Sequence, residues 1–328
     1  MKSIREHLNT AGLMALLALL LTPVMSQAQA YPSKSLRFIV PFAPGGNTDV
    51  AARLIANGLS RQMGQPIVVE NRAGAGGAIG TDFVAKAPPD GYTVLVGHIG
   101  ALTINPAIYE KLPYNTQKDF EPVGLSVVTP LVLVSSSNVG IRSMAELIAR
   151  AKAEPGKLTY GSAGSGSAGH MASELFNVAA DIKTTHIPYK GAGPATTALL
   201  SGEVTFRFNG QAPSQAFVKS GKLIALGVTG MNPSPQFPGV PTLSSLGLKD
   251  FEVVDWSGLL LPAGTPKSIV AKLNVELNKY LNLPETKIQL AQLGFEGRPG
   301  TPSQFAEFIE SEMEKWGRSA KAANLKVN

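Results

Sequence analysis

The junction between Pro41 and Asp49 most constrains how this chain can fold. An apolar run, Leu36–Phe42, leads into it and predicts a buried strand, and Val50–Met63 follows with apolar residues at helical spacing. Between the two, a pair of glycines permits a sharp turn and exposes backbone N–H groups. A helix that begins here directs its unpaired N–H groups and positive dipole end at the turn. The junction therefore predicts an α/β unit with an anion site suited to a phosphate or a carboxylate.

The side chains of this turn are expected to shape the start of the helix. Asn47 or Thr48 is a candidate to cap it, and Asp49 would lie in the first turn. A carboxylate in that position stabilises a helix by roughly 0.3–1 kcal/mol. For Asp49 we therefore favour capping or bracing of the loop over direct contact with a ligand.

The first thirty residues have the features of a secretory signal peptide. Lys2 and Arg5 make a basic start, Ala11–Leu21 is an apolar run too short to span a bilayer, and Ala28–Ala30 is an A-x-A cleavage signal. We expect cleavage after Ala30 and release of a free protein into the periplasm. The chain has no cysteine, which excludes disulfides, thiolate metal sites, cysteine nucleophiles and lipid attachment to a cysteine.

Charge and histidine content exclude some classes of partner. The chain has 29 Lys and Arg against 23 Asp and Glu, a formal net charge of +6, and its basic residues are scattered. No run is built for nucleic acid, and the mild positive balance slightly favours small anions, although many exported proteins are simply basic. The histidines of the mature chain, His98, His170 and His186, lack metal-ligand spacing, so we expect neither a metal site nor a cofactor.

Strand and helix patterns alternate along the chain, which indicates an α/β fold with largely parallel sheets. Phe120–Val128 and Leu131–Ser135 predict two of these strands. A second glycine-rich turn, Gly161–Ser167, also follows a strand, and a helix begins at Ala168 with Ser167 as its N-cap. If the two turns belong to different lobes and face one cleft, a ligand would lie between two helix N-termini, at the carboxyl ends of strands.

Two enzymatic readings of the glycine-rich segments have little support. Gly74–Gly80 resembles a dinucleotide fingerprint but has Ile79 where the third glycine belongs, and no Walker pattern is present. Ser165 lacks the flanking glycines of a nucleophile elbow, and no motif places an acidic partner. The turns consist of Gly, Ser, Ala, Thr and Asn, which donate hydrogen bonds, so they favour a receptor over an enzyme. A hydrolase on a binding-protein scaffold remains an alternative.

A series of short motifs runs in order through the mature chain: Tyr31–Lys34, Val40–Asp49, Val69–Gly77, Pro89–Tyr92, Ile104–Tyr109, Tyr160–Ser167 with His170, Ile187–Gly191 and Pro262–Pro266. Together they resemble the solute-binding proteins of tripartite tricarboxylate transporters, the Bug family of periplasmic solute receptors. The resemblance implies a type II-like periplasmic binding protein with two lobes, each a mostly parallel sheet flanked by helices. Lobe I would comprise 31–130 plus 255–328, and lobe II 131–254.

The resemblance also implies where the ligand binds. The two glycine-rich loops would grip one carboxylate, largely through backbone N–H groups and partly through ordered water, and His170 would be a wall residue. The predicted ligand-binding residues are Phe42, Ala43, Gly45, Gly46, Thr48, Asp49, His98, Ser162, Ala163, Gly164, Ser165, Ser167, His170, Arg207 and Asn209.

The chain departs from the family pattern at three places. His98 stands where a threonine-like residue is expected, Asn209 and Gly210 replace an Asp-Asn pair, and Arg207 replaces an apolar residue. These exchanges make the neighbourhood more positive. We hypothesise a ligand with a second acidic group, such as a dicarboxylate or an aromatic acid, rather than an amino acid. Arg207 could instead be an exposed strand residue.

The resulting prediction is a monomeric, non-enzymatic receptor that closes about a hinge on a small organic acid. It would deliver the acid to the membrane components of a tripartite tricarboxylate-type transporter. The alternative is a receptor that acts on a sensor kinase without transport.

Overall fold

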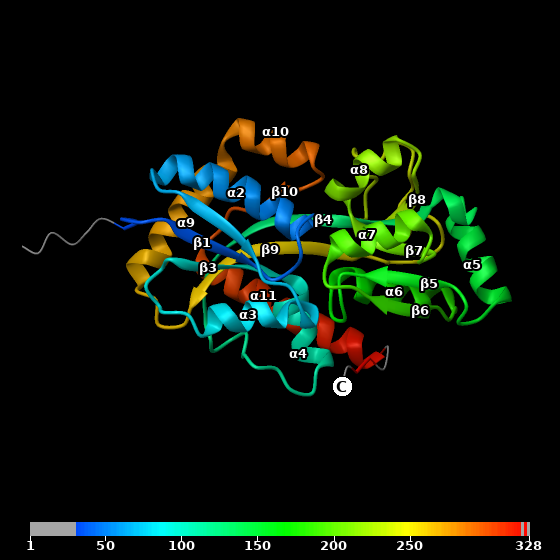
Figure 1. The fold of residues 1–328 in the computed structure, drawn as a ribbon, viewed down its shortest axis with the longest axis horizontal. Helices are drawn as coiled ribbons and strands as arrows, with labels where there is room; N and C mark the ends of the chain where they lie inside the picture. Colours follow the sequence, from blue (N-terminus) through cyan, green and yellow to red (C-terminus); the bar gives the residue numbers. More distant parts are fainter. Residues whose placement is uncertain (1–30, 323–324, 327–328) are drawn as a thin grey trace, which may run out of the picture. The chain divides into compact units, whose positions relative to one another are not determined.

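Ten strands among the described residues form a sheet that divides into two halves (Figure 1). In the first half the order is β2, β1, β3, β9 and β4, and β10 also pairs with β4; in the second half β4 continues beside β7 and β8, and β7 leads to β5 and β6. The strands are β1 (Leu36–Val40), β2 (Ile67–Asn71), β3 (Thr93–His98), β4 (Phe120–Ser136), β5 (Thr159–Ser162), β6 (Thr185–Pro188), β7 (Phe206–Gly210), β8 (Leu223–Val228), β9 (Val254–Pro262) and β10 (Glu296–Gly297).

The structure is a computed structural model that describes residues 31–322 and 325–326. The predicted signal peptide, residues 1–30, lies outside the described residues. Residues 1–33 and 34–328 are separate units, and the fold described here is that of the second. No helix in the described part of the chain combines the length and apolar character needed to cross a membrane.

Helices cover both halves of the sheet (Figure 1). Those that contact the first half are α2, α3, α9, α10 and α11, and those that contact the second half are α6, α7 and α8. The α-helices are α2 (Asn47–Met63), α3 (Ala78–Ala85), α4 (Asn105–Ile108), α5 (Met144–Ala153), α6 (Ala168–Ala180), α7 (Ala192–Ser201), α8 (Gln211–Lys219), α9 (Lys267–Asn282), α10 (Pro284–Gln292) and α11 (Pro302–Ala322). Short 3₁₀ or π turns occupy Ala75–Gly77, Gly100–Ile104 and Ser137–Val139.

The longest strand, β4, belongs to both halves. Its residues Phe120–Pro130 pair with β9, and Leu131–Ser136 pair with β7 and β8. The sequence predicted two strands here, and they are one because the ladder continues across Thr129 and Pro130 with a change of partner. Both β4 and β9 run antiparallel to their neighbours, so each half is a mixed sheet around a parallel group rather than a largely parallel one.

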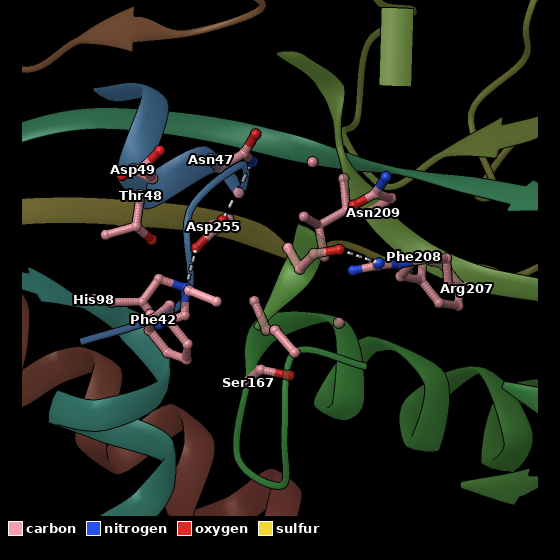
Figure 2. Close-up of a pocket in the computed structure, with 18 residues that line it drawn as sticks. Phe42, Asn47, Thr48, Asp49, His98, Ser167, Arg207, Phe208, Asn209 and Asp255 are labelled. Carbon is pink, nitrogen blue, oxygen red and sulfur yellow. Dashed lines mark hydrogen bonds and ion pairs between the residues drawn. The ribbon is translucent and has the colours of Figure 1, made fainter. Parts of the chain in front are cut away.

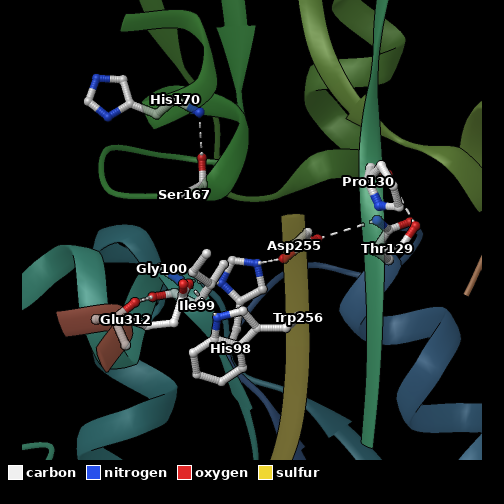
Figure 3. Close-up of polar contacts among 12 residues, drawn as sticks. His98, Ile99, Gly100, Thr129, Pro130, Ser167, His170, Asp255, Trp256 and Glu312 are labelled. Carbon is white, nitrogen blue, oxygen red and sulfur yellow. Dashed lines mark hydrogen bonds and ion pairs between the residues drawn. The ribbon is translucent and has the colours of Figure 1, made fainter. Parts of the chain in front are cut away.

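Side chains of α11 pack against one face of the strand β9. Trp256 is 1% exposed, and its ring packs edge-on against Phe305 and Phe308. Its Nε1–H donates to the buried carboxylate of Glu312 at 3.0 Å (Figure 3). Trp316 Nε1 donates to the same oxygen at 2.8 Å. Because side chains alternate along a strand, burying Trp256 on this side turns its neighbour Asp255 to the opposite face.

Candidate functional site

Four helix N-termini meet at one pocket between the two halves of the sheet. The first residues of α2, α6 and α7 and the residue before α8 line it, together with the ends of β3 and β7 and one position on each of β4 and β9. In Figure 2, the labelled residues of the first half (Phe42, Asn47, Thr48, Asp49, His98 and Asp255) face those of the second (Ser167, Arg207, Phe208 and Asn209). Helix N-termini carry partial positive charge, so this convergence favours an anion.

Three of these helices begin on glycine and have no side-chain cap. Gly46, Gly191 and Gly210 are the N-caps of α2, α7 and α8, and none makes a capping hydrogen bond through a side chain. The prediction that Asn47 or Thr48 caps α2 is wrong, because the helix starts one residue earlier. Uncapped first turns keep backbone N–H groups directed at the pocket. By contrast, α6 has the predicted cap: Ser167 Oγ accepts from the His170 N–H at 3.3 Å.

Asp49 braces the first glycine-rich turn. Its carboxylate accepts from the Gly45 N–H at 3.1 Å, from Asn71 Nδ2 at 2.9 Å and from Arg53 Nε at 3.1 Å, and it pairs with Arg53 Nη2 at 3.0 Å. Burial alone would raise the pKa of Asp49, but these hydrogen bonds and the Arg53 charge outweigh it and lower the pKa. The geometry agrees with the bracing role expected for this residue, and its charge is neutralised by Arg53.

His98 and Asp255 form a buried pair at the ends of β3 and β9. The two side chains lie 2.9 Å apart between Nε2 and Oδ1 (Figures 2 and 3). Gly100 N–H donates to His98 Nδ1 at 2.9 Å, so Nδ1 is an acceptor and the ring proton is on Nε2. The Nε2–H group of His98 therefore faces Oδ1 of Asp255. Asn47 Nδ2 donates to the other oxygen, Oδ2, at 3.3 Å.

Arg207 is a charged side chain of the pocket that has no ion-pair partner among the described residues. Its side chain is 2% exposed, which excludes the alternative of an exposed strand residue. Nη1 donates to Ala192 O at 2.8 Å and to Thr196 Oγ1 at 3.0 Å, while Nε is buried without a partner. Burial lowers the pKa of Arg207 to about 9, so the guanidinium stays positive at neutral pH. No carboxylate of the described residues lies within ion-pair distance of it.

Asn209 extends this polar group on β7. Its Nδ2 donates to Ser214 Oγ at 2.8 Å and to Thr196 Oγ1 at 3.4 Å, and its Oδ1 is buried with no partner. Thr196 therefore joins Arg207 and Asn209 at the start of α7. The result is a polar wall on the second half of the sheet that is fixed by hydrogen bonds within the protein.

The structure brings ten of the fifteen predicted ligand-binding residues to this pocket. They are Phe42, Ala43, Gly46, Thr48, Asp49, His98, Ala163, Ser167, Arg207 and Asn209. The other five lie just outside its lining: Gly45, Ser162, Gly164, Ser165 and His170.

Those five residues support the loops or the contact between the halves. Ser162 Oγ lies 2.6 Å from His186 Nε2, and the His170 ring stacks on His186 with centroids 4.2 Å apart. Ser165 O accepts from Tyr109 Oη of the first half at 3.5 Å. The Ser162–His186 contact does not make a catalytic triad, since no carboxylate of the described residues hydrogen-bonds His186.

Sequence reasoning missed eight lining residues. Most flank predicted ones, and two come from the central strands, where nothing in the motifs pointed to a ligand. The single acidic residue in an otherwise apolar strand, Asp255, was the available signal. The missed residues are Asn47, Leu131, Ala168, Gly169, Ala192, Phe208, Gly210 and Asp255.

The comparisons with known proteins agree on one family. Residues 51–325 match the TctC family, described as the tripartite tricarboxylate transporter family receptor. The chain belongs to this family. Among the relatives of this receptor, BugT of Bordetella pertussis is 37% identical over 301 residues, 92% of each chain. The membership that the motifs implied is confirmed.

Solved structures place the receptor in the same group. A protein of R. palustris, Rpa4515, solved with adipate, has a TM-score of 0.88 and 33% identity, and the match covers 90% of this chain and 99% of that one. MatC from Rhodopseudomonas palustris, solved with bound malate, has a TM-score of 0.84 and 34% identity, with 88% and 99% covered. Periplasmic binding proteins are among these neighbours, so the predicted two-lobed α/β fold is confirmed. Family and fold are those of solute-binding proteins, not of enzymes.

Proposed function

We propose that this protein is a periplasmic receptor that binds a small organic acid in the pocket between the lobes and delivers it to the membrane components of a tripartite tricarboxylate-type transporter. The observation that carries the proposal is Arg207, a buried guanidinium that lines the pocket with no acidic partner. A buried charge without a counter-ion is costly, and a ligand carboxylate would supply the counter-ion. The four converging helix N-termini favour the same charge.

The size of the pocket supports a small ligand. Its cavity volume is about 50 Å³. A single water needs about 10–15 Å³ on this measure, so the space corresponds to a few water molecules. The relatives solved with adipate and malate hold acids of a few carbon atoms, which support the same class here.

Opening and closing of the lobes would admit and enclose the ligand. The lobes are connected by β4 and by the segment that enters β9, and β4 changes partners between Pro130 and Leu131. We place the lobe boundaries there and at 254/255, with the hinge at these crossings. Recognition of the closed, loaded form by the membrane components would couple capture to uptake.

The test is binding of a panel of carboxylates to the refolded, ligand-free mature protein by thermal shift and calorimetry. A ligand at about a hundred times its Kd adds about 2.7 kcal/mol of stability. Replacing Arg207 by Gln is expected to weaken binding of an acid by roughly 30-fold or more, because the ligand charge loses its partner. Arg142→Gln, an exposed arginine on the second lobe, is the matched control and should bind as the wild type does.

Two results would contradict the proposal. One is that no small carboxylate shifts the melting temperature of the ligand-free protein. The other is that the Arg207 and Arg142 variants bind acids equally well.

A further inference from the structure

The tip of the second glycine-rich turn, residues 164–166, contacts the first lobe outside the ligand pocket. There Gly166 packs on Asn105, the first residue of α4, so closely that a Cβ would lie 1.8 Å from Asn105 Oδ1. Neither Asn105 nor Gly166 lines the pocket, whereas Ala163 and Ser167, which flank the tip, both do. The place where the tip meets the first lobe therefore sets the position of one pocket wall.

The tip is held in shape by its own lobe. Gly166 N–H donates to His170 Nδ1 at 3.2 Å, and Gly164 N–H donates to Ser162 Oγ at 3.1 Å. Gly164 and Gly166 have φ angles of 122° and 79°, a region of backbone conformation that glycine adopts without strain. The second lobe thus presents the tip as a fixed projection that can dock as one piece.

The first lobe has a matching socket, formed by Gly76, Gly100, Asn105 and Tyr109. A Cβ at Gly76 would lie 2.1 Å from Ser165 O, and one at Gly100 would lie 2.5 Å from Gly166 O. Tyr109 Oη donates to Ser165 O at 3.5 Å. Larger residues at positions 76 and 100 would keep the tip out, so the socket fits the tip only because it is lined by glycine.

Asn105 is the polar centre of this socket. Its side chain is fully buried, and Nδ2 donates to Gly76 O at 3.0 Å. A carbonyl oxygen can only accept, so the amide nitrogen must face Gly76 and Oδ1 must be the atom that faces Gly166. Oδ1 has no hydrogen-bond partner among the described residues. Because Gly166 has a hydrogen where other residues have Cβ, its Cα–H points at Oδ1 and makes a weak polar contact.

We infer that Asn105 is a positioning residue for closure of the receptor, an inference that rests on the proposed function. A single carboxamide joins two glycine-rich segments, because its nitrogen fixes Gly76 and its oxygen meets Gly166 of the opposite lobe. When the lobes separate, Gly166 leaves Asn105 and water can reach Oδ1. The contact therefore favours the closed arrangement, and the measured affinity for an acid depends on Asn105 although Asn105 does not line the pocket.

A double-mutant cycle on the mature protein tests this coupling. The probe is the acid of the carboxylate panel that binds the wild type most tightly in calorimetry, with malate and adipate tried first. Gly166→Ala is expected to weaken binding roughly 30-fold, because its Cβ would overlap Asn105 Oδ1. Asn105→Ala alone is expected to weaken binding roughly fivefold.

The double variant gives the decisive comparison. Removing the Asn105 carboxamide makes room for the new Cβ, so the double variant should bind at least about fivefold more tightly than Gly166→Ala alone. The strain of an alanine at φ 79° is present in both proteins and cancels in this comparison. Asn282→Ala, an exposed asparagine on α9, is the matched control and should give no such recovery when it is combined with Gly166→Ala.

Binding kinetics separate closure from support of the first lobe. A contact that only the closed lobes make acts on release of the acid, so Asn105→Ala should raise the dissociation rate about fivefold and change the association rate less than about twofold. A residue that only stabilised its own lobe would lower the free energy of unfolding without this division between the rates. Circular dichroism checks the fold of each variant, and Asn105→Ser takes the place of Asn105→Ala should the latter not fold.

The outcomes distinguish this inference from the proposed function. If the acid binds the wild type but the double variant binds no more tightly than Gly166→Ala, Asn105 does not control docking of the tip, and the inference is overturned while the receptor function stands. If no acid of the panel binds the wild type, the proposed function fails and the inference fails with it.

Discussion

At the residue scale, two stacked histidines behind the second glycine-rich turn predict a pH dependence of stability. Burial lowers the pKa of His186 to about 4 and, together with the neighbouring His186, lowers that of His170 to about 3. In the unfolded chain both pKa values return to about 6.5. Between pH 6.5 and 4 the unfolded state therefore binds more protons, and stability falls as the pH falls, by up to about 1.4 kcal/mol per pH unit for each histidine.

This slope can be measured by urea unfolding at pH 7, 6 and 5. Replacing His186 by Gln, whose amide can still reach Ser162, is expected to remove about half of the loss between pH 6.5 and 5. The measurement window lies above the titration of Asp49, whose lowered pKa affects stability only below pH 4. A pH slope that is the same in wild type and variant would show that the buried pair does not set the acid stability.

Single residues were predictable from sequence only where a motif fixed their neighbours. Gly46 and Ser167 follow from strand–turn–helix patterns, because a local turn determines which backbone groups point at the pocket. Asp255 could not be found this way. It reaches the pocket because β9 pairs with β3 and β4, and those partners are more than 120 residues away along the chain. Its role depends on long-range pairing that no local pattern encodes.

At the scale of elements, the contact between α11 and β9 predicts a specific loss of stability. Glu312 accepts from both Trp256 and Trp316 in a buried site. Both indoles donate to one carboxylate oxygen, so a glutamine would offer them a neutral and weaker acceptor, and its NH₂ group would replace the oxygen that pairs with Lys315. We expect Glu312→Gln to lower the free energy of unfolding by about 1–3 kcal/mol.

The matched control lies on the same helix. Glu310 is exposed, and replacing it by Gln changes the same charge without breaking a buried hydrogen bond. Urea unfolding of both variants at pH 7 measures the difference. Equal midpoints for the two would mean that the negative charge of Glu312 adds nothing measurable to its hydrogen bonds with the two indoles.

Most helices and strands were predictable from the periodicity of apolar residues, and the exception is the long strand β4. The capped helices and the buried strand β1 follow directly from local patterns. The two predicted strands Phe120–Val128 and Leu131–Ser135 became one strand, because a proline at 130 interrupts the sequence pattern without interrupting the ladder to β9. A change of partner along one strand is decided by the packing of two sheets, which the sequence does not display locally.

At the scale of the whole receptor, glycines form much of the contact between the two lobes. A Cβ added at Gly193 of the second lobe would lie 2.5 Å from Pro44 O of the first, and one at Gly100 would lie 2.5 Å from Gly166 O. Cβ atoms essentially never approach other atoms so closely, so the lobes could not meet in this arrangement with larger residues there. We therefore expect substitutions at this contact to affect ligand binding more than stability.

Gly193→Ala tests this expectation with little cost to the fold of the second lobe. Position 193 lies in the first turn of α7 and does not require the left-handed conformation, so alanine is compatible with the helix. A Cβ against Pro44 O obstructs full closure of the lobes, so we expect the affinity for a bound acid to fall by roughly tenfold or more. The free energy of unfolding of the unliganded protein should change by less than about 1 kcal/mol. Gly317→Ala in α11, where a Cβ meets nothing within 4 Å, controls for the change of residue type. Calorimetry and small-angle scattering with and without ligand measure affinity and closure. If Gly193→Ala binds and closes as Gly317→Ala does, the glycines are not what allows the lobes to meet.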